Sequence, residues 1–274
     1  MSSPRVVLTG VRPLQAVRRA PLQARRTRDH VVRSLLSLAI RRLERSMNGR
    51  SPVGPFIPTD ALAGLRALEE NWTAIRLELD AISVRRADLP NFQDISADQR
   101  PITDDDHWKT YFFYGYGHRF TGNCARCPQT AELLDHVPGL TTAFFSILGP
   151  HKHVPEHRGP YKGVIRYHLA LRIPRPWEAS GIRVGSQTAH WEEGKAIAFD
   201  DTYPHEAWNG TAEDRTVLFL DIVRPLPFPH SWLNRFVIWG IARSPFVRDA
   251  KRNHDSWERK FVRPGLDDRK GCPR

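Results

Sequence analysis

Two segments of alternating residues, Val164 to Ile173 and Arg215 to Val223, constrain what this chain can fold into more than any other feature. In each segment apolar side chains recur at every second position, which is the period of a β-strand with one face in a hydrophobic core. The opposite faces carry Arg166, His168, Ala170 and Arg172 in the first segment, and Arg215, Val217, Phe219 and Asp221 in the second. The pattern predicts two strands that hold charged and imidazole groups on the side away from the core.

Two histidines, His157 and His205, stand near these strands, and each strand has an arginine on its polar face. Neutral imidazole is the commonest ligand for iron, zinc or copper, and the arginine fork matches a carboxylate. Taken singly, each histidine is more simply a residue of the core. Their order and their placement beside strands together predict a metal site next to an anion-binding site.

A set of short motifs occurs in order between about Leu62 and Pro225. The motifs are His157-x-Gly159, Arg166-x-His168, Trp191-x-x-Gly194, Phe199-Asp200-Asp201, His205-Glu206-x-Trp208 and Arg215 ten positions after His205. They resemble those of the aspartyl/asparaginyl β-hydroxylase family. Trp108 to Phe113, Cys127-Pro128 and Gly163 are further similar to bacterial members related to lipid A acyl-chain hydroxylases. The resemblance implies a mainly β fold with flanking helices and a double-stranded β-helix core, which is jelly-roll and cupin-like.

The resemblance also implies an oxygenase that uses Fe(II), 2-oxoglutarate and O₂ to hydroxylate an unactivated C–H bond. It assigns His157 and His205 as metal ligands and catalytic residues. The residues implied for the cosubstrate are Arg215 and Ser146 at its distal carboxylate, with Arg166 and His168 near the end that chelates iron. A peptide Asp or Asn, a free amino acid and a lipid acyl chain are all open as substrates.

Gly159 stands at the position where iron sites of two histidines and a carboxylate have their acid, two residues after the first histidine. The site is therefore completed by water, or by a carboxylate from elsewhere in the chain, or it has lost activity. Glycine here resembles the aspartyl hydroxylases, which favours water, whereas the acyl-chain hydroxylases carry an acid. We expect Asp200 and Asp201 to cap the turn before His205 rather than to bind metal.

A second class of function is a non-catalytic metal- or ligand-binding β-barrel that its basic tails recruit to a membrane or a partner. The chain has 41 Lys and Arg against 30 Asp and Glu, and its net charge of +11 favours anionic partners. No nucleic-acid fold motif accompanies this charge, so we expect no specific nucleic-acid binding.

We predict four segments along the 274 residues. They are a basic N-terminal segment with an amphipathic helix (1–50), a linker and helical lead-in (51–106), the double-stranded β-helix oxygenase domain (107–225) and a basic, aromatic helical tail (226–274). In the lead-in, the linker spans Ser51 to Pro58, and a helix runs from Thr59 or Asp60 to about Ile82.

Both ends of the chain have features that suit an anionic membrane surface. Residues 32–47 repeat apolar side chains at helical spacing among arginines, and Trp232, Phe236 and Trp239 share one helical face. Packing of these helices on the domain is the alternative. No apolar stretch is long enough to span a membrane, and three cysteines form no disulfide framework. We therefore expect a cytoplasmic protein, with its two ends as candidates for peripheral binding to the inner face of the membrane.

Overall fold

The computed structural model describes residues 54–62 and 64–261, together with the isolated positions Leu38, Ile40, Arg42, Glu44 and Arg45. The chain divides into two units, Met1–Leu38 and Ala39–Arg274, and the described residues belong almost entirely to the second. Apart from those isolated positions, which are helical, the predicted N-terminal amphipathic helix lies outside the described residues, as does the end of the basic tail.

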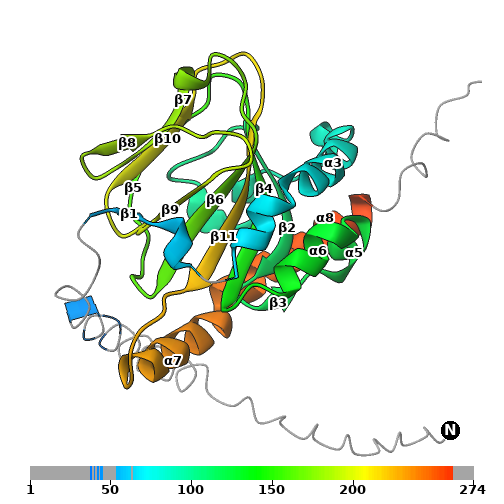
Figure 1. The fold of residues 1–274 in the computed structure, drawn as a ribbon. Helices are drawn as coiled ribbons and strands as arrows, with labels where there is room; N and C mark the ends of the chain where they lie inside the picture. The colour runs from blue at the N-terminus through cyan, green and yellow to red at the C-terminus, as the bar shows by residue number, and fades with distance from the viewer. Residues whose placement is uncertain are drawn as a thin grey trace, which may run out of the picture. The chain divides into compact units, whose positions relative to one another are not determined.

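Two antiparallel sheets form the body of the second unit (Figure 1). The large sheet has the strand order β1-β9-β6-β11-β4-β2-β3, and the small sheet has the order β5-β10-β7-β8. The strands of the large sheet are β1 (Phe56–Ile57), β2 (Trp108–Gly115), β3 (His118–Arg119), β4 (Leu140–Leu148), β6 (Val164–Arg172), β9 (Ala196–Phe199) and β11 (Arg215–Val223). Those of the small sheet are β5 (His153–His157), β7 (Ser180–Val184), β8 (Gln187–Ala189) and β10 (His205–Asn209).

From β4 to β11 the chain passes back and forth between the two sheets. Strands β4, β6, β9 and β11 lie in the large sheet, and β5, β7, β8 and β10 lie in the small one. This alternation winds the chain into a double-stranded β-helix, so the predicted fold class is confirmed. The two segments that alternate most clearly in the sequence are β6 and β11, which pair with each other at the centre of the large sheet.

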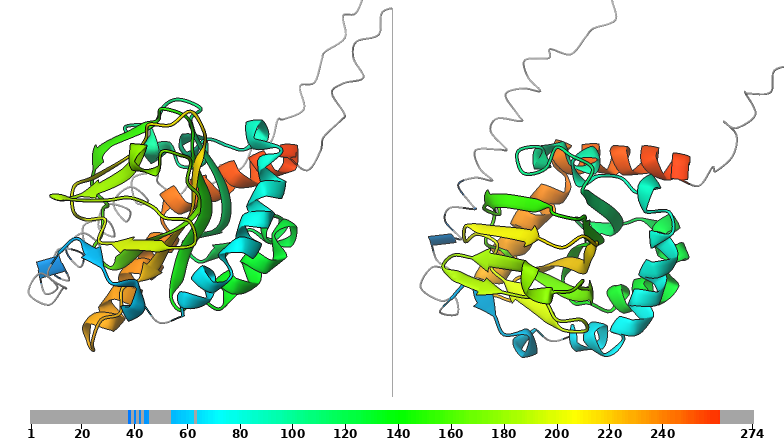
Figure 2. Two further views of the ribbon diagram at one scale, coloured as in Figure 1. Left: turned by 45° about the horizontal axis from the view of Figure 1, so that its top comes forward. Right: turned by 90° about the horizontal axis from the view of Figure 1, so that it is seen from above.

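Helices cover the outer face of the large sheet, the face turned away from the small sheet (Figure 2). The α-helices are α2 (Arg66–Glu70), α3 (Trp72–Ser83), α4 (Phe92–Ile95), α5 (Thr121–Arg126), α6 (Pro128–Asp135), α7 (His230–Ala242) and α8 (Pro245–Phe261). Short 3₁₀-helices occur at η1 (Thr59–Ala61), η2 (Arg86–Asp88), η3 (Ala97–Gln99) and η4 (Trp177–Ala179). Apolar side chains of α2, α3, α5, α6 and the end of α8 form the main core with the outward residues of β2, β4, β6 and β11. No helix among the described residues is long and apolar enough to cross a bilayer.

The helical lead-in differs from the prediction in two respects. The single helix predicted up to Ile82 is divided into η1, α2 and α3, because Gly64 adopts φ +88° and the helical conformation is interrupted again at Asn71. The predicted linker from Ser51 to Pro58 contains β1, which pairs with β9 and widens the large sheet. The predicted apolar stripe is nevertheless buried at Leu65, Leu68, Ile75, Leu79 and Ile82.

Arg172 lies on the opposite face of β6 from the one predicted. The register between β6 and β11 shifts beyond Ala170, and this bulge reverses the direction of the next side chain. The guanidinium of Arg172 consequently pairs with Asp80 of α3. The face of β6 that looks toward the small sheet carries Arg166 and His168 but not Arg172.

Phe145 provides a test of this core assignment. Its side chain is fully buried on the helix-covered face of β4, with its ring centroid 4.9 Å from that of Phe113. Phe145→Ala should leave a cavity and lower the free energy of unfolding by about 3–5 kcal/mol. Leu77→Ala is the control, because Leu77 on α3 is 70% exposed, and its effect should stay within about 0.5 kcal/mol. Urea unfolding followed by circular dichroism measures both, and equal losses would contradict the assignment.

Candidate active site

The candidate residues of the large sheet share the face that looks toward the small sheet. On β6 and β11, His168 pairs with Phe219 and Arg166 pairs with Asp221, while Ser146 of β4 lies opposite Val217 of β11. Cross-strand partners point to the same side of a sheet, so the register places Arg166, His168, Arg215 and Ser146 on one surface.

His157 and His205 face this surface from the small sheet. His157 ends β5 and His205 begins β10, and the two are direct cross-strand partners with ring centroids 4.2 Å apart. The Nδ1 atom of His157 lies 2.8 Å from the carbonyl oxygen of Pro155, and Nδ1 of His205 lies 2.9 Å from that of Tyr203. These bonds keep the proton on Nδ1 and leave the Nε2 lone pair of each ring available. The pair therefore fits a metal ion that both imidazoles share.

Both imidazoles are held in the neutral form that a metal ligand requires. Burial, together with the positive charge of Arg166 and the neighbouring His157, lowers the pKa of His205 to about 3. Burial likewise lowers the pKa of His157, although its hydrogen bond to Pro155 works in the other direction. No proton has to leave either ring near neutral pH before a metal binds.

Arg166 is engaged by two carboxylates of the protein. Its Nε and Nη2 atoms lie 3.0 and 3.3 Å from the two carboxylate oxygens of Asp221, and Nη2 lies 3.0 Å from Oδ2 of Asp201. The charge of Arg166 is thus offset by these two carboxylates. The structure places Arg166 near both histidines, and its contact with a cosubstrate stays a prediction.

Arg215, unlike Arg166, has no acidic partner among the described residues. Its guanidinium is buried, with Cζ 4.3 Å from the ring centroid of Trp191, and it has no carboxylate or hydrogen-bond partner among the described residues. Burial lowers the pKa of Arg215 to about 9. A buried cation without a counter-ion is unfavourable, and binding an anion would remove that cost. Ser146 on β4 accepts a hydrogen bond of 3.0 Å from Trp108, which leaves its hydroxyl proton free for an anion.

His168 lies near Arg215, Arg166 and His205 and has no hydrogen-bond partner among the described residues. Its ring contacts Trp191, Phe199 and Phe219, and neither ring nitrogen has a hydrogen bond. Burial, with the positive charge of Arg215, holds the pKa of His168 well below its usual value. Buried polar atoms are normally satisfied, so these two nitrogens fit a polar molecule bound between the sheets.

Of the two acids predicted to cap the turn before His205, Asp200 does so. Oδ1 of Asp200 accepts hydrogen bonds from the backbone nitrogen and the hydroxyl of Thr202 at 3.1 and 2.6 Å. Oδ2 of Asp200 lies 2.9 Å from Nη2 of Arg224. Asp200 therefore caps the turn, and both of its carboxylate oxygens are engaged by other residues.

Asp201 fills the space beside Gly159. A Cβ atom at position 159 would lie 2.0 Å from Oδ2 of Asp201, and the Gly159 N–H donates to the backbone oxygen of Asp201 at 2.7 Å. Burial raises the pKa of the Asp201 carboxyl to about 6, against the opposing effect of Arg166. Within residues 54–62 and 64–261, no three His, Cys, Asp or Glu side chains are arranged to hold a metal. Gly159 thus meets a packing requirement, and the two histidines stand as a pair.

Two acidic residues of the site, Asp201 and Asp221, were not assigned these roles from the sequence. The position of Asp221 on the polar face of its strand was visible, but its pairing with Arg166 depends on the register of β6 against β11. The approach of Asp201 to Gly159 joins segments more than forty positions apart along the chain, and no local pattern marks it.

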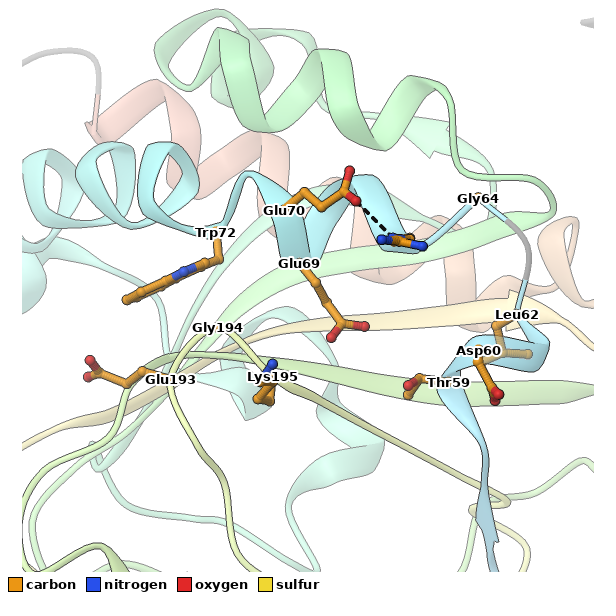
Figure 3. A pocket seen from close by; sticks show the side chains of 11 residues that line it. Thr59, Asp60, Leu62, Gly64, Glu69, Glu70, Trp72, Glu193, Gly194 and Lys195 are labelled. Carbon is orange, nitrogen blue, oxygen red and sulfur yellow. Dashed lines mark hydrogen bonds and ion pairs between the residues drawn. The ribbon is translucent and has the colours of Figure 1, made fainter.

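A cavity of about 710 Å³ lies away from this site, between α2, the start of α3 and the loop after β8 (Figure 3). Its charged side chains are partly paired, since Arg66 binds Glu70 and the Tyr167 hydroxyl donates to Glu69. Tyr167 belongs to the outer face of β6, so the cavity opens on the opposite side of the large sheet from the histidine pair. None of the candidate residues lines it.

Comparisons with known proteins identify the family of the chain. The model of the aspartyl/asparaginyl β-hydroxylase family matches residues 69–225, more than half of the chain. The chain is 46% identical over 211 residues to an ornithine lipid ester-linked acyl 2-hydroxylase of Rhizobium tropici, covering 76% of this chain and 74% of that one. It is 31% identical over 166 residues to the human aspartyl/asparaginyl β-hydroxylase, covering 59% of this chain but only 21% of that protein.

Among solved structures, a prolyl-4-hydroxylase of Pseudomonas putida is 16% identical, with a TM-score of 0.36. The likeness covers 59% of this chain and all of that one. A likeness this weak adds nothing to the description of the site.

The lowered pKa of His205 predicts how the stability of the metal-free protein depends on pH. His205 has a pKa of about 3 in the folded chain and an ordinary value of 6.5, so between these values the unfolded chain binds more protons. The stability present above pH 6.5 should be lost progressively as the pH falls toward 3. Urea unfolding at neutral and mildly acidic pH measures this loss. The loss should be smaller in His205→Gln, and an equal loss in the variant would contradict the shift.

The contact between Gly159 and Asp201 predicts the outcome of moving the carboxylate. Gly159→Asp should lower the free energy of unfolding by about 1–3 kcal/mol, because the new side chain overlaps Asp201. The double variant Gly159→Asp/Asp201→Gly removes the overlap and should recover at least half of the loss. Thermal unfolding of both variants checks this, and a double variant no more stable than the single one would exclude the overlap as the cause.

Proposed function

The chain belongs to the aspartyl/asparaginyl β-hydroxylase family, and on this premise we propose that it is an Fe(II)- and 2-oxoglutarate-dependent hydroxylase of lipid acyl chains. One combination of features carries the proposal. A pair of neutral imidazoles, His157 and His205, faces an unpaired buried cation, Arg215, across the space between two sheets. The first arrangement suits a metal ion, and the second suits a dianionic cosubstrate.

The residues have separate tasks in this proposal. His157 and His205 would hold Fe(II) through Nε2, and the iron would supply the activation of O₂ that side chains lack. Arg215 would bind the distal carboxylate of 2-oxoglutarate with both arms of its guanidinium, assisted by the Ser146 hydroxyl. The buried, low-dielectric position of Arg215 strengthens such an ion pair.

The two remaining candidates would position the cosubstrate from the centre of the sheet. Neutral His168 can donate one hydrogen bond and accept another, and both of its nitrogens are unused. Arg166, fixed by Asp201 and Asp221, would act through its electric field on the end of the cosubstrate nearest the metal. This leaves Arg215 as the cation reserved for the ligand.

A buried aromatic row makes the same face of the large sheet apolar beside His168, and Phe92 of α4 covers its far end. The row consists of Phe219, Phe144 and Phe112. The ring centroid of Phe144 lies 4.3 Å from that of Phe219 and 4.5 Å from that of Phe112. The centroid of Phe219 lies 5.0 Å from that of His168. Aromatic side chains favour contact with hydrocarbon over a polar peptide backbone. The 46% identity to an acyl 2-hydroxylase points the same way.

The proposal is tested by turnover. The protein is first equilibrated with Fe(II) and 2-oxoglutarate without oxygen, and succinate is then measured after O₂ is added with an ester-linked acyl lipid. An aspartate-containing peptide and a free amino acid serve as the competing substrates. Succinate and hydroxylated lipid are expected with the acyl lipid. Succinate with the peptide alone would correct the substrate class, and no succinate with any substrate would support a non-catalytic binding barrel.

The charge of Arg215 predicts a specific effect on the cosubstrate. Arg215→Ala should raise the 2-oxoglutarate concentration for half-maximal turnover by roughly 30-fold or more, because it removes the ion pair with the distal carboxylate. Arg183→Ala is the matched control, since Arg183 of β7 pairs with Glu156 and Glu206 and takes no part in the proposed site. It should leave this concentration unchanged. A requirement unaltered in the Arg215 variant would place the cosubstrate elsewhere.

A further inference from the structure

Helix α7 presents a row of aromatic side chains to solvent. Trp232 is 72% exposed, Phe236 60% and Trp239 52%, and Phe228 just before the helix is 77% exposed. Trp232, Phe236 and Trp239 are spaced by four and three positions, so they lie on one side of the helix. The rings of Phe236 and Trp239 stack with their centroids 5.8 Å apart. We call Phe228, Trp232, Phe236 and Trp239 the α7 aromatic face. Exposed apolar patches of this kind mark binding surfaces.

The opposite side of α7 is fixed to the segment that follows His157. Asn234 and Val237 are fully buried, and Nδ2 of Asn234 donates to the carbonyl oxygen of Gly163 at 2.8 Å. Oδ1 of Asn234 accepts a hydrogen bond from the Tyr161 hydroxyl. A Cβ atom at Gly163 would lie 2.1 Å from Oδ1 of Asn234, so the glycine permits this close approach. The α7 aromatic face is therefore held outward by the same contacts that tie the helix to the site.

The charges around the face restrict its partner. Residues 230–242 contain no acidic side chain, and Arg235 and Arg243 are exposed. The guanidinium of Arg243 lies 4.1 Å from the ring centroid of Trp239. Aromatic rings interleaved with guanidinium groups are typical of helices that lie in the headgroup region of an anionic bilayer. A second copy of this chain would instead bring the same positive charge to the interface.

We propose that the α7 aromatic face docks on an anionic lipid bilayer. Trp232, Phe236 and Trp239 enter the boundary between headgroups and acyl chains, and Arg235 and Arg243 contact lipid phosphates. The proposal concerns binding and does not rest on hydroxylase activity. If the proposed function also holds, docking brings the lipid to the side of the protein where α7 joins the segment after His157.

The first test is flotation of the full chain with vesicles. Wild-type protein should float with vesicles of phosphatidylglycerol and phosphatidylcholine, and less with phosphatidylcholine alone. The triple variant Trp232→Ser/Phe236→Ser/Trp239→Ser should bind roughly 100-fold more weakly, because three apolar side chains no longer enter the bilayer. Trp177→Ser is the matched control, since Trp177 is an exposed aromatic residue of η4 outside the face, and it should float like wild type.

The contribution of charge is tested separately. Arg235→Gln/Arg243→Gln should weaken binding to phosphatidylglycerol vesicles by roughly 10- to 30-fold and make it less dependent on salt. A double variant that binds as wild type does would overturn the predicted contact with phosphates.

A label reports on insertion even if the triple variant folds poorly. Phe236→Cys, with Cys272→Ser, carries a polarity-sensitive fluorophore, while Cys124 and Cys127 are buried. Its emission should shift to the blue when phosphatidylglycerol vesicles are added. Emission that is already blue without vesicles would mean that the chain itself or a second copy covers the face, and this would overturn the proposal. No shift on vesicles, or no flotation of the wild-type chain, would overturn it as well.

Discussion

The pairing of β5 with β10 is the contact on which the rest of the structure depends. It makes His157 and His205 direct neighbours at the edge of the small sheet that looks toward the large one. The carbonyl oxygens of Pro155 and Tyr203 hold the Nδ1 protons and thereby leave both Nε2 lone pairs available. Sheet geometry alone thus brings together two imidazoles that lie almost fifty positions apart in the chain.

The two arginines between the sheets have different partners, and the roles proposed for them rest on this difference. Arg166 is surrounded by Asp201 and Asp221, so its charge is already compensated. Arg215 is more deeply buried and lies against Trp191 without a counter-ion among the described residues. The buried charge of Arg215 is therefore uncompensated, and binding an anion there would be favourable.

Local patterns in the sequence predicted the central strands and the side that most of their residues face, because alternation of side chains needs no knowledge of the partner strand. The resemblance to the hydroxylase family added Ser146, which local patterns alone would have left as an ordinary strand residue. Features that depend on register or on distant approach were not predictable. Arg172 is turned outward by a bulge, and Asp201 meets Gly159 across more than forty positions.

The central claim is that His157 and His205 bind one metal ion together. Electron spin-echo modulation of Mn(II), bound in place of iron, measures coupling to ligand nitrogens. The account predicts coupling to two imidazole nitrogens in the wild-type protein, and the loss of one or both in His157→Gln and in His205→Gln. Coupling to no nitrogen, or a spectrum that neither substitution changes, would contradict it.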